Sequence, residues 1–265
     1  RPRFTEPGLP DQLAFHEALA DLVAMLSVFD LDGLAQHLLD PDDTGKVRLD
    51  GDGPAADPEQ RRAARATALK TSPLLRLAEQ LGARRAAPGT SHPYPALRRS
   101  GELPAGDAWK SDPAFGEPHR RAEVLVAAFL QTFVTIWASR LEPLRVDADG
   151  MDADRVAEEG VKSARHLLGM ALRALDYLPP VDLEFGDVID AVVTADQRLA
   201  PDDDHHYRDA LTATFAAFGI TPPPHRILDQ DRIPDRRRAE PPEAAYPPDP
   251  DADTALGVRY EHLNL

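Results

Sequence analysis

The sequence predicts an all-α protein body followed by a proline-rich C-terminal tail. Apolar residues recur with helical spacing in several long segments, and the alternating pattern of an amphipathic strand is almost absent. After Ile220 the composition changes: prolines become dense and large apolar residues become rare. We therefore divide the chain into a helical domain, residues 1–220, and a linker or tail, residues 221–265.

Charge and composition narrow the classes of function. The chain of 265 residues carries 45 Asp and Glu against 30 Lys and Arg, a formal net charge of -15, which argues against a nucleic-acid or anionic-membrane partner. It has no cysteine, so any metal must be bound by His, Asp or Glu. We find no run of about 18 apolar residues and expect no membrane span. Arg1 opens the sequence without a signal-peptide pattern, and we expect a piece of a longer or processed protein.

The N-terminal part is expected to begin with a long helix. Pro10 and Asp11 suit its first turn, because proline lacks an N–H and a carboxylate favours the positive end of the helix dipole. Apolar residues then keep the helical period to about Asp30. A short helix over 33–39 and a short extended piece over 46–49 should follow.

The middle of the chain combines helices with one long loop. Helices are predicted over 59–69 and 73–81. Residues 86–116 form a predicted loop of about 30 residues, a length that is typical of a functional or mobile segment. The strongest helix follows and covers 117–141.

Three more helices are predicted before the tail. A loop rich in Asp and Gly, 146–152, precedes a helix over 153–175, and a second helix covers 185–196. The last helix runs over 204–218, with Asp202 as its N-terminal cap and Gly219 as its end.

Two carboxylates on the first helix are the starting point for function. Glu17 and Asp21 are four residues apart and therefore share one face of a mostly apolar helix. Buried, such a pair would be costly without a cation or hydrogen-bond donors beside it. The plainer interpretation is a solvated helix face.

The segment Glu17-Ala-Leu-Ala-Asp21 resembles the E-x-x-x-D motif of the thermolysin-like (gluzincin) metallopeptidases. In that family, two His of an H-E-x-x-H helix and the Glu of E-x-x-x-D bind one zinc ion, with water in the fourth position. The resemblance implies that Glu17 is the third zinc ligand. It also implies that Asp21 accepts a hydrogen bond from a zinc-bound His. The fold it implies is the multi-helix C-terminal subdomain of a zincin-like metallopeptidase.

A second segment matches the same family. Glu117-Pro-His119 directly precedes a long apolar helix, where the family places a His against the tetrahedral intermediate. The resemblance implies that His119 stabilises the oxyanion, and either Asp112 or Glu117 could orient its ring. The alternative is that His119 is simply a polar residue at a helix start.

The chain departs from the family at one point, because H-E-x-x-H occurs nowhere in it. The resemblance then implies the C-terminal half of a zinc-dependent metalloendopeptidase that acts on a peptide or protein substrate. We expect the two His ligands of the Zn²⁺ and the general-base Glu to come from an upstream half of the same protein. The isolated chain should be inactive.

Two other functions stay open. One is a non-catalytic helical interaction module, in which Glu17 and Asp21 face solvent or pair with Arg or Lys. The other is a hydrolase that uses Asp182 and Glu184 as paired carboxylates, for which no spacing argument exists. The cluster 202–206 holds two adjacent histidines, which point in different directions on a helix and are not expected to share a metal.

Overall fold

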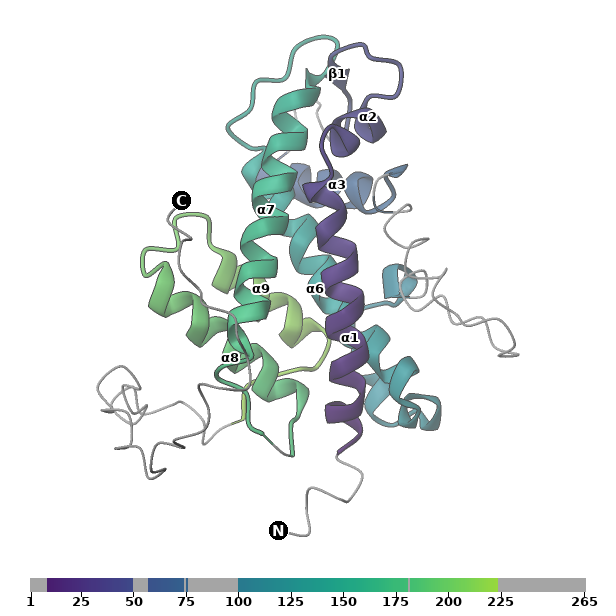
Figure 1. Cartoon of the computed structure of the whole chain (residues 1–265). Helices are drawn as coiled ribbons and strands as arrows, with labels where there is room; N and C mark the ends of the chain where they lie inside the picture. Colours follow the sequence, from purple (N-terminus) through teal and green to yellow (C-terminus); the bar gives the residue numbers. More distant parts are fainter. Residues whose placement is uncertain (1–8, 50–56, 74, 76–99, 181, 224–265) are drawn as a thin grey trace, which may run out of the picture. The chain divides into compact units, whose positions relative to one another are not determined.

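The computed structural model describes residues 9–49, 57–73, 75, 100–180 and 182–223, all within one compact unit of the chain, Arg1–Pro224 (Figure 1). This part is mostly helical, which confirms the all-α prediction. Most of the predicted helix 73–81, part of the predicted loop 86–116 and the tail from residue 224 onward lie outside the described residues. The α-helices are α1 Pro10–Ser27, α2 Leu34–Leu39, α3 Pro58–Lys70, α6 Pro118–Arg140, α7 Ala153–Ala174, α8 Phe185–Leu199 and α9 Tyr207–Ala217, with 3₁₀ turns Val28–Asp30, Ala108–Lys110 and Pro113–Gly116.

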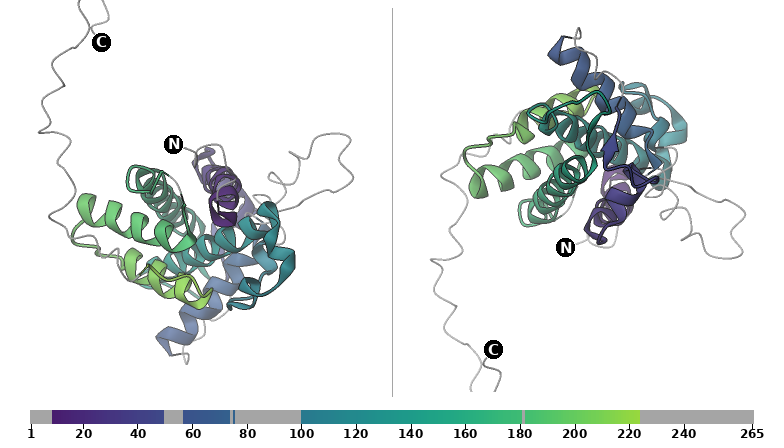
Figure 2. Two further views of the ribbon diagram at one scale, coloured as in Figure 1. Left: turned by 90° about the horizontal axis from the view of Figure 1, so that it is seen from below. Right: turned by 90° about the horizontal axis from the view of Figure 1, so that it is seen from above.

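Helix α6 is the centre of the bundle. Figure 2 shows it between α1 on one side and α3 and α9 on the other. Its N-terminus is capped by Glu117, whose carboxylate accepts hydrogen bonds from the backbone N–H groups of His119 (3.1 Å) and Arg120 (2.7 Å). Residues 122–130 are all buried, as expected for a helix that is apolar on every side.

An aromatic cluster joins the 3₁₀ turn Val28–Asp30, α6 and α7. Phe29 meets Phe133 edge to face, with ring centroids 4.8 Å apart, and Phe133 lies 5.5 Å from Trp137. The indole N–H of Trp137 donates to the carbonyl of Val156 on α7 (2.9 Å). Gly160 lets α7 approach this indole, because a Cβ there would lie 2.6 Å from the Trp137 ring.

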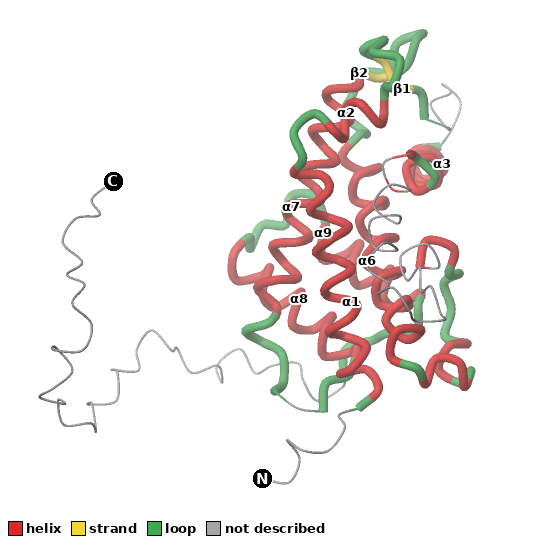
Figure 3. Tube along the Cα trace, turned by 45° about the vertical axis from the view of Figure 1, so that its right-hand side comes forward, coloured by secondary structure: helices red, strands yellow, loops and turns green. Residues whose placement is uncertain are grey.

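A two-stranded ribbon closes one end of the bundle (Figure 3). Strand β1, Lys46–Val47, pairs antiparallel with β2, Met151–Asp152. The extended piece predicted over 46–49 is confirmed at its first two residues, whereas β2 falls where a loop was predicted over 146–152. The two strands are too short to show an alternating pattern, so neither gives a strand signal of its own.

The helix ends match the predictions less closely than the helix bodies. Asp203, and not the predicted Asp202, caps α9: its carboxylate accepts from the backbone N–H of Tyr207 (2.8 Å) and of Arg208 (3.1 Å). This is possible because His206 adopts φ +55°, which turns the chain so that a carboxylate further back can reach the helix start. Gly219, at φ +71°, ends the helix as predicted.

Two stretches, Pro10–Asp30 and Pro118–Arg140, have the length and apolar composition of a membrane span. This corrects the expectation that no stretch is apolar enough. The criterion rests on length and composition alone, and a buried core helix satisfies it as well. In Pro118–Arg140, 83% of the most apolar window is buried, as in a core helix. In Pro10–Asp30, 44% of that window is buried. The less covered helix, α1, carries Glu17 and Asp21.

Candidate functional site

Glu17 and His119 meet where α1 passes the beginning of α6. The Nε2 atom of His119 lies 3.8 Å from Oε1 of Glu17, and the side chains are 47% and 52% exposed. Helix packing causes this meeting, because α1 lies directly along α6 (Figure 1). Two residues that were singled out from separate segments of the sequence therefore share one open surface.

The second nitrogen of the imidazole contacts another carboxylate. Nδ1 of His119 lies 2.6 Å from Oε1 of Glu117, the residue that caps α6. Of the two residues predicted to orient this ring, Glu117 is in place. Asp112 instead accepts from the backbone N–H of Ala114 (2.9 Å) and caps the preceding 3₁₀ turn. One carboxylate thus both caps the helix and fixes the imidazole ring.

These contacts change the acid–base properties of the pair. The hydrogen bond that His119 donates to Glu117 raises the pKa of His119; partial burial opposes this increase, and the charges of Glu117, Glu17 and Asp21 add to it. Burial acts to raise the pKa of Glu117, but the hydrogen bonds from the His119 side chain and from the Arg120 and His119 N–H groups outweigh it and lower that pKa. The arrangement favours an imidazolium held between carboxylates.

Asp21 lies on α1 one turn beyond Glu17, and its charge acts on His119. We call the set of Glu17, Asp21, Glu117 and His119 the α1–α6 site. In the described part of the chain, no group of three or more His, Cys, Asp or Glu side chains is placed so that it could hold a metal ion. Among these described residues, the α1–α6 site therefore does not form a complete metal site by itself.

A buried ion pair fixes the relative position of α1 and α6 beside this site. Asp11, in the first turn of α1, binds the guanidinium of Arg121 and accepts a hydrogen bond from the backbone N–H of Phe185 at the start of α8 (2.9 Å). Arg121 also lies over the ring of Trp109, 4.8 Å from its centroid. The sequence analysis assigned Asp11 only to a helix start. No local sequence pattern indicates that Asp11 also links α1 to α6 and α8.

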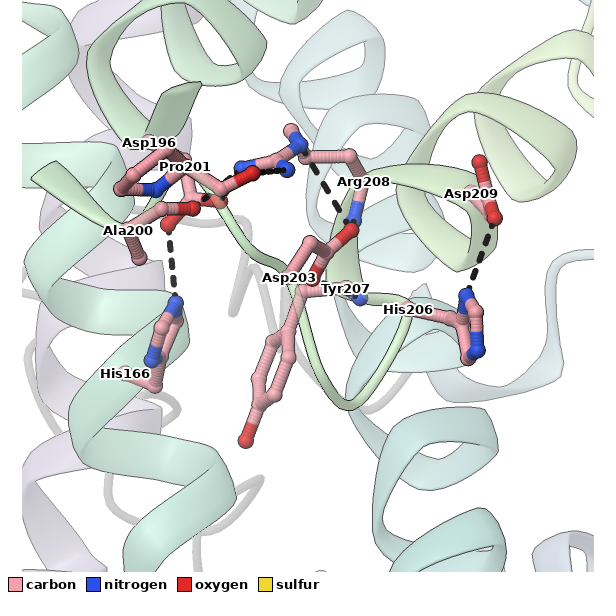
Figure 4. A network of polar contacts seen from close by, with 9 residues as sticks. All are labelled: His166, Asp196, Ala200, Pro201, Asp203, His206, Tyr207, Arg208 and Asp209. Carbon is pink, nitrogen blue, oxygen red and sulfur yellow. Dashed lines mark hydrogen bonds and ion pairs between the residues drawn. The ribbon is translucent and has the colours of Figure 1, made fainter. Parts of the chain in front are cut away.

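A second polar network, which the sequence analysis did not find, links α7, α8 and α9 (Figure 4). Buried Asp196 contacts Nε2 of His166 (2.9 Å) with one oxygen and Nη1 of Arg208 (2.8 Å) with the other. The His166 ring stacks on Tyr207 at 4.1 Å between centroids. Each carboxylate oxygen of buried Asp196 has a partner on another helix, so we assign this network to stability.

The other acidic and histidine groups separate as follows. His206 pairs with Asp209 (3.3 Å), whereas the His205 ring lies edge-on to Tyr207. Both histidines precede α9, which begins at Tyr207 and not at residue 204 as predicted. Glu184 forms a reciprocal capping box with Asp187 at the start of α8. This structural role accounts for Glu184, one of the two carboxylates of the paired-carboxylate hypothesis.

Comparison of the chain with protein-family models, with curated proteins and with solved structures finds no match in any of the three. The chemistry of the α1–α6 site is therefore argued from its own residues.

Proposed function

We propose that this chain is the helical C-terminal part of a zinc-dependent metallopeptidase and that Glu17 is the metal ligand it contributes. The observation that carries the proposal is the 3.8 Å approach of His119 to Glu17. The motif resemblance needs a glutamate ligand and an oxyanion histidine on one surface, and packing of α1 on α6 supplies that arrangement. The two residues lie far apart in the sequence, and their proximity is consistent with the resemblance.

In the proposed site each residue of this chain has a separate role. Glu17 binds the metal, and Asp21, one turn further along α1, accepts a hydrogen bond from an imidazole that also binds it. Zinc, when bound, polarises the scissile carbonyl and activates water. His119 then donates an N–H to the oxygen that becomes negatively charged, and its raised pKa keeps that proton in place near neutral pH. Glu117 holds the ring in position.

Two imidazole ligands and a general-base carboxylate must join this wall from another segment of the protein. The half-exposed side chains of Glu17 and His119 are accessible to such a segment. We infer an upstream H-E-x-x-H helix as that segment and a peptide or protein as the substrate. On this proposal the isolated chain binds zinc weakly and does not hydrolyse peptides.

The test is peptide hydrolysis by the complete protein, with zinc content measured in parallel. We expect activity that a chelator removes and that zinc restores. Glu17→Gln should lower both zinc content and activity, whereas His119→Asn should keep zinc and lower kcat by about 10²- to 10³-fold, as for loss of one oxyanion donor. Glu158→Gln and His37→Asn are matched controls away from the site and should change neither quantity. Activity that survives chelation, or no activity at all, contradicts the proposal.

The alternative is a helical interaction module without catalysis. It is favoured by one observation: the side chain of Glu17 is 52% exposed, as expected for a solvated helix face. It predicts that the complete protein contains no stoichiometric zinc and that Glu17→Gln leaves every measured activity unchanged. The same zinc measurement therefore decides between the two functions.

A further inference from the structure

A groove of about 700 Å³ lies between α3 and α9, with α6 as its floor. We call it the α3–α9 groove. Figure 2 shows α3 and α9 on the side of α6 that faces away from α1. His119 and Gln131 are twelve residues apart on α6, which corresponds to about 18 Å along the helix, so the groove is separate from the α1–α6 site. Ligand binding in this groove is independent of the proposed function.

The middle of the groove is apolar and lined by short side chains. Ala63 and Ala66 of α3 and Ala210 of α9 face it together with Ile136 of α6. Because three of these four side chains end at Cβ, the helices leave an open volume between them. That volume lies within the range of about 300–1,000 Å³ that is typical of small-molecule pockets with apolar walls.

Hydrogen-bond donors gather at one end of the groove. Helix α3 runs antiparallel to α6: Nζ of Lys70 lies 3.4 Å from Oε1 of Gln131, and Nη2 of Arg61 lies 3.1 Å from Oε2 of Glu142, just beyond the opposite end of α6. This register brings Arg62 to the end of the groove that contains Ser139.

His205 belongs to the same end. Its pKa is lowered, mainly by partial burial and further by the positive charge of Arg140, which follows Ser139 on α6. The imidazole of His205, the hydroxyl of Ser139 and the guanidinium of Arg62 all line the groove. In the described part of the chain, the only partner of the Arg62 side chain is the carbonyl of Pro58 in its own helix (3.4 Å), so this guanidinium is available for an anion.

We propose that the α3–α9 groove binds an unbranched aliphatic carboxylate, with the chain along the apolar middle and the carboxylate at Arg62. The guanidinium presents two parallel N–H groups, which match the two oxygens of a carboxylate. Ser139 and His205 supply further donors at that end. An uncharged ligand of equal length would use the apolar middle alone.

Two acidic residues line the groove and oppose an anion, Glu59 and Asp209. Glu59 lies one turn before Arg62 on α3 and also lines the groove. Its negative charge repels a bound carboxylate, so its removal should strengthen binding while removal of Arg62 should weaken it. Opposite changes in affinity for the Glu59 and Arg62 substitutions are expected only for a ligand with a charged headgroup.

The experiment is equilibrium dialysis of the whole chain against labelled decanoate, with decanol as the uncharged comparison. We expect saturable binding of one decanoate per chain. Arg62→Gln should weaken it about two- to fivefold and Glu59→Gln should strengthen it by a similar factor, as for exposed ion pairs. Ala63→Phe, at an exposed position on α3, should abolish it by filling the groove. Decanol should bind more weakly and should not respond to either charge variant.

Matched controls separate the groove from general effects on the protein. Arg173→Gln on α7 and Ala216→Phe on α9 are exposed and lie outside the groove, and they should leave decanoate binding unchanged. Equal binding to the Ala63→Phe variant, or an Arg62→Gln variant that binds as tightly as the original, overturns the proposal. Binding of an acidic amphipathic helical peptide to the same residues without binding of decanoate also overturns it, and assigns the groove to a helix.

Discussion

The imidazole of His119 lies 3.8 Å from the carboxylate of Glu17, although the two residues belong to different helices and are far apart in the sequence. Their positions have separate causes. Glu17 is placed by the period of α1, and His119 is placed by the cap that Glu117 forms at the start of α6. Both side chains stay about half exposed, so the pair forms an open surface that another polypeptide can cover. The site depends on how α1 and α6 pack, and its properties can be tested through that packing.

The titration of His119 is the first prediction. The hydrogen bond that His119 donates to Glu117 raises the pKa of His119 above the ordinary value of 6.5. ¹H–¹⁵N NMR should therefore place the titration midpoint of His119 above that value. Glu117→Gln should shift the midpoint downward, and Glu17→Gln should shift it by a smaller amount. A Glu117→Gln variant with an unchanged His119 midpoint contradicts the assignment.

The same shift fixes the sign of the pH dependence of stability. A group with a pKa that is higher in the folded state stabilises the fold fully below the unfolded pKa, here 6.5, and loses that contribution as pH rises through the folded pKa. Urea unfolding of the parent and of His119→Gln should therefore differ most near pH 6. The difference should disappear above the folded pKa of His119.

Asp11 is the subject of the next prediction. Asp11→Asn removes the charge that pairs with partly buried Arg121 at the junction of α1, α6 and α8. We expect a loss of about 2–4 kcal/mol in the free energy of unfolding, because Arg121 is left without its counter-charge. Asp30→Asn breaks an exposed ion pair with Arg165 and should cost less than about 1 kcal/mol. Equal losses of unfolding free energy for the two substitutions would show that the Asp11–Arg121 pair stabilises the fold no more than an exposed ion pair does.

The helix bodies could be predicted from the sequence because each one has its own apolar pattern. Helix α6 was predicted over 117–141 and covers Pro118–Arg140; α7 was predicted over 153–175 and covers Ala153–Ala174. Helix α7 has a strong period because it buries one apolar face, whereas α6 is predicted from the length of its apolar run because nearly all of it is buried in the core. Features that depend on a single residue or a short pair, such as β2 and the Asp203 cap, have no repeat from which they could be predicted.

The candidate site shows the same division between local and distant information. The position of Glu17 and Asp21 on one helix face follows from their spacing. The hydrogen bond between the His119 ring and the Glu117 carboxylate follows from the place of Glu117 two residues before His119. The roles of Asp11 and Asp196 do not follow from spacing, because their partners lie on other helices. Two acidic residues of similar local context can therefore be an exposed surface group or the centre of a buried network, and only tertiary packing decides which.

Asp196 gives a prediction for the network of Figure 4. Asp196→Asn replaces a buried carboxylate that is shared by His166 and Arg208. The guanidinium of Arg208 is only 15% exposed, so it would lose its closest counter-charge in a poorly hydrated place. We expect a loss of about 2–4 kcal/mol in chemical denaturation. Asp209→Asn, which affects an exposed pair with His206, should change stability by less than about 1 kcal/mol.

Two glycines of α7 provide the last prediction, as a matched pair in one helix. A methyl group at Gly160 would lie 2.6 Å from the buried ring of Trp137, so Gly160→Ala forces α6 and α7 apart. Overpacking of this kind costs about 1–3 kcal/mol, more than alanine gains over glycine in a helix, and thermal unfolding should show a lower Tm.

At Gly169 the nearest atom to an added methyl group is the guanidinium end of Arg173 at 3.3 Å, which can move aside. Gly169→Ala should therefore stabilise the fold by up to about 1 kcal/mol, because alanine favours the helix over glycine. The opposite signs test the close α6–α7 contact directly: if both substitutions raise Tm, α7 does not pack against Trp137 at Gly160.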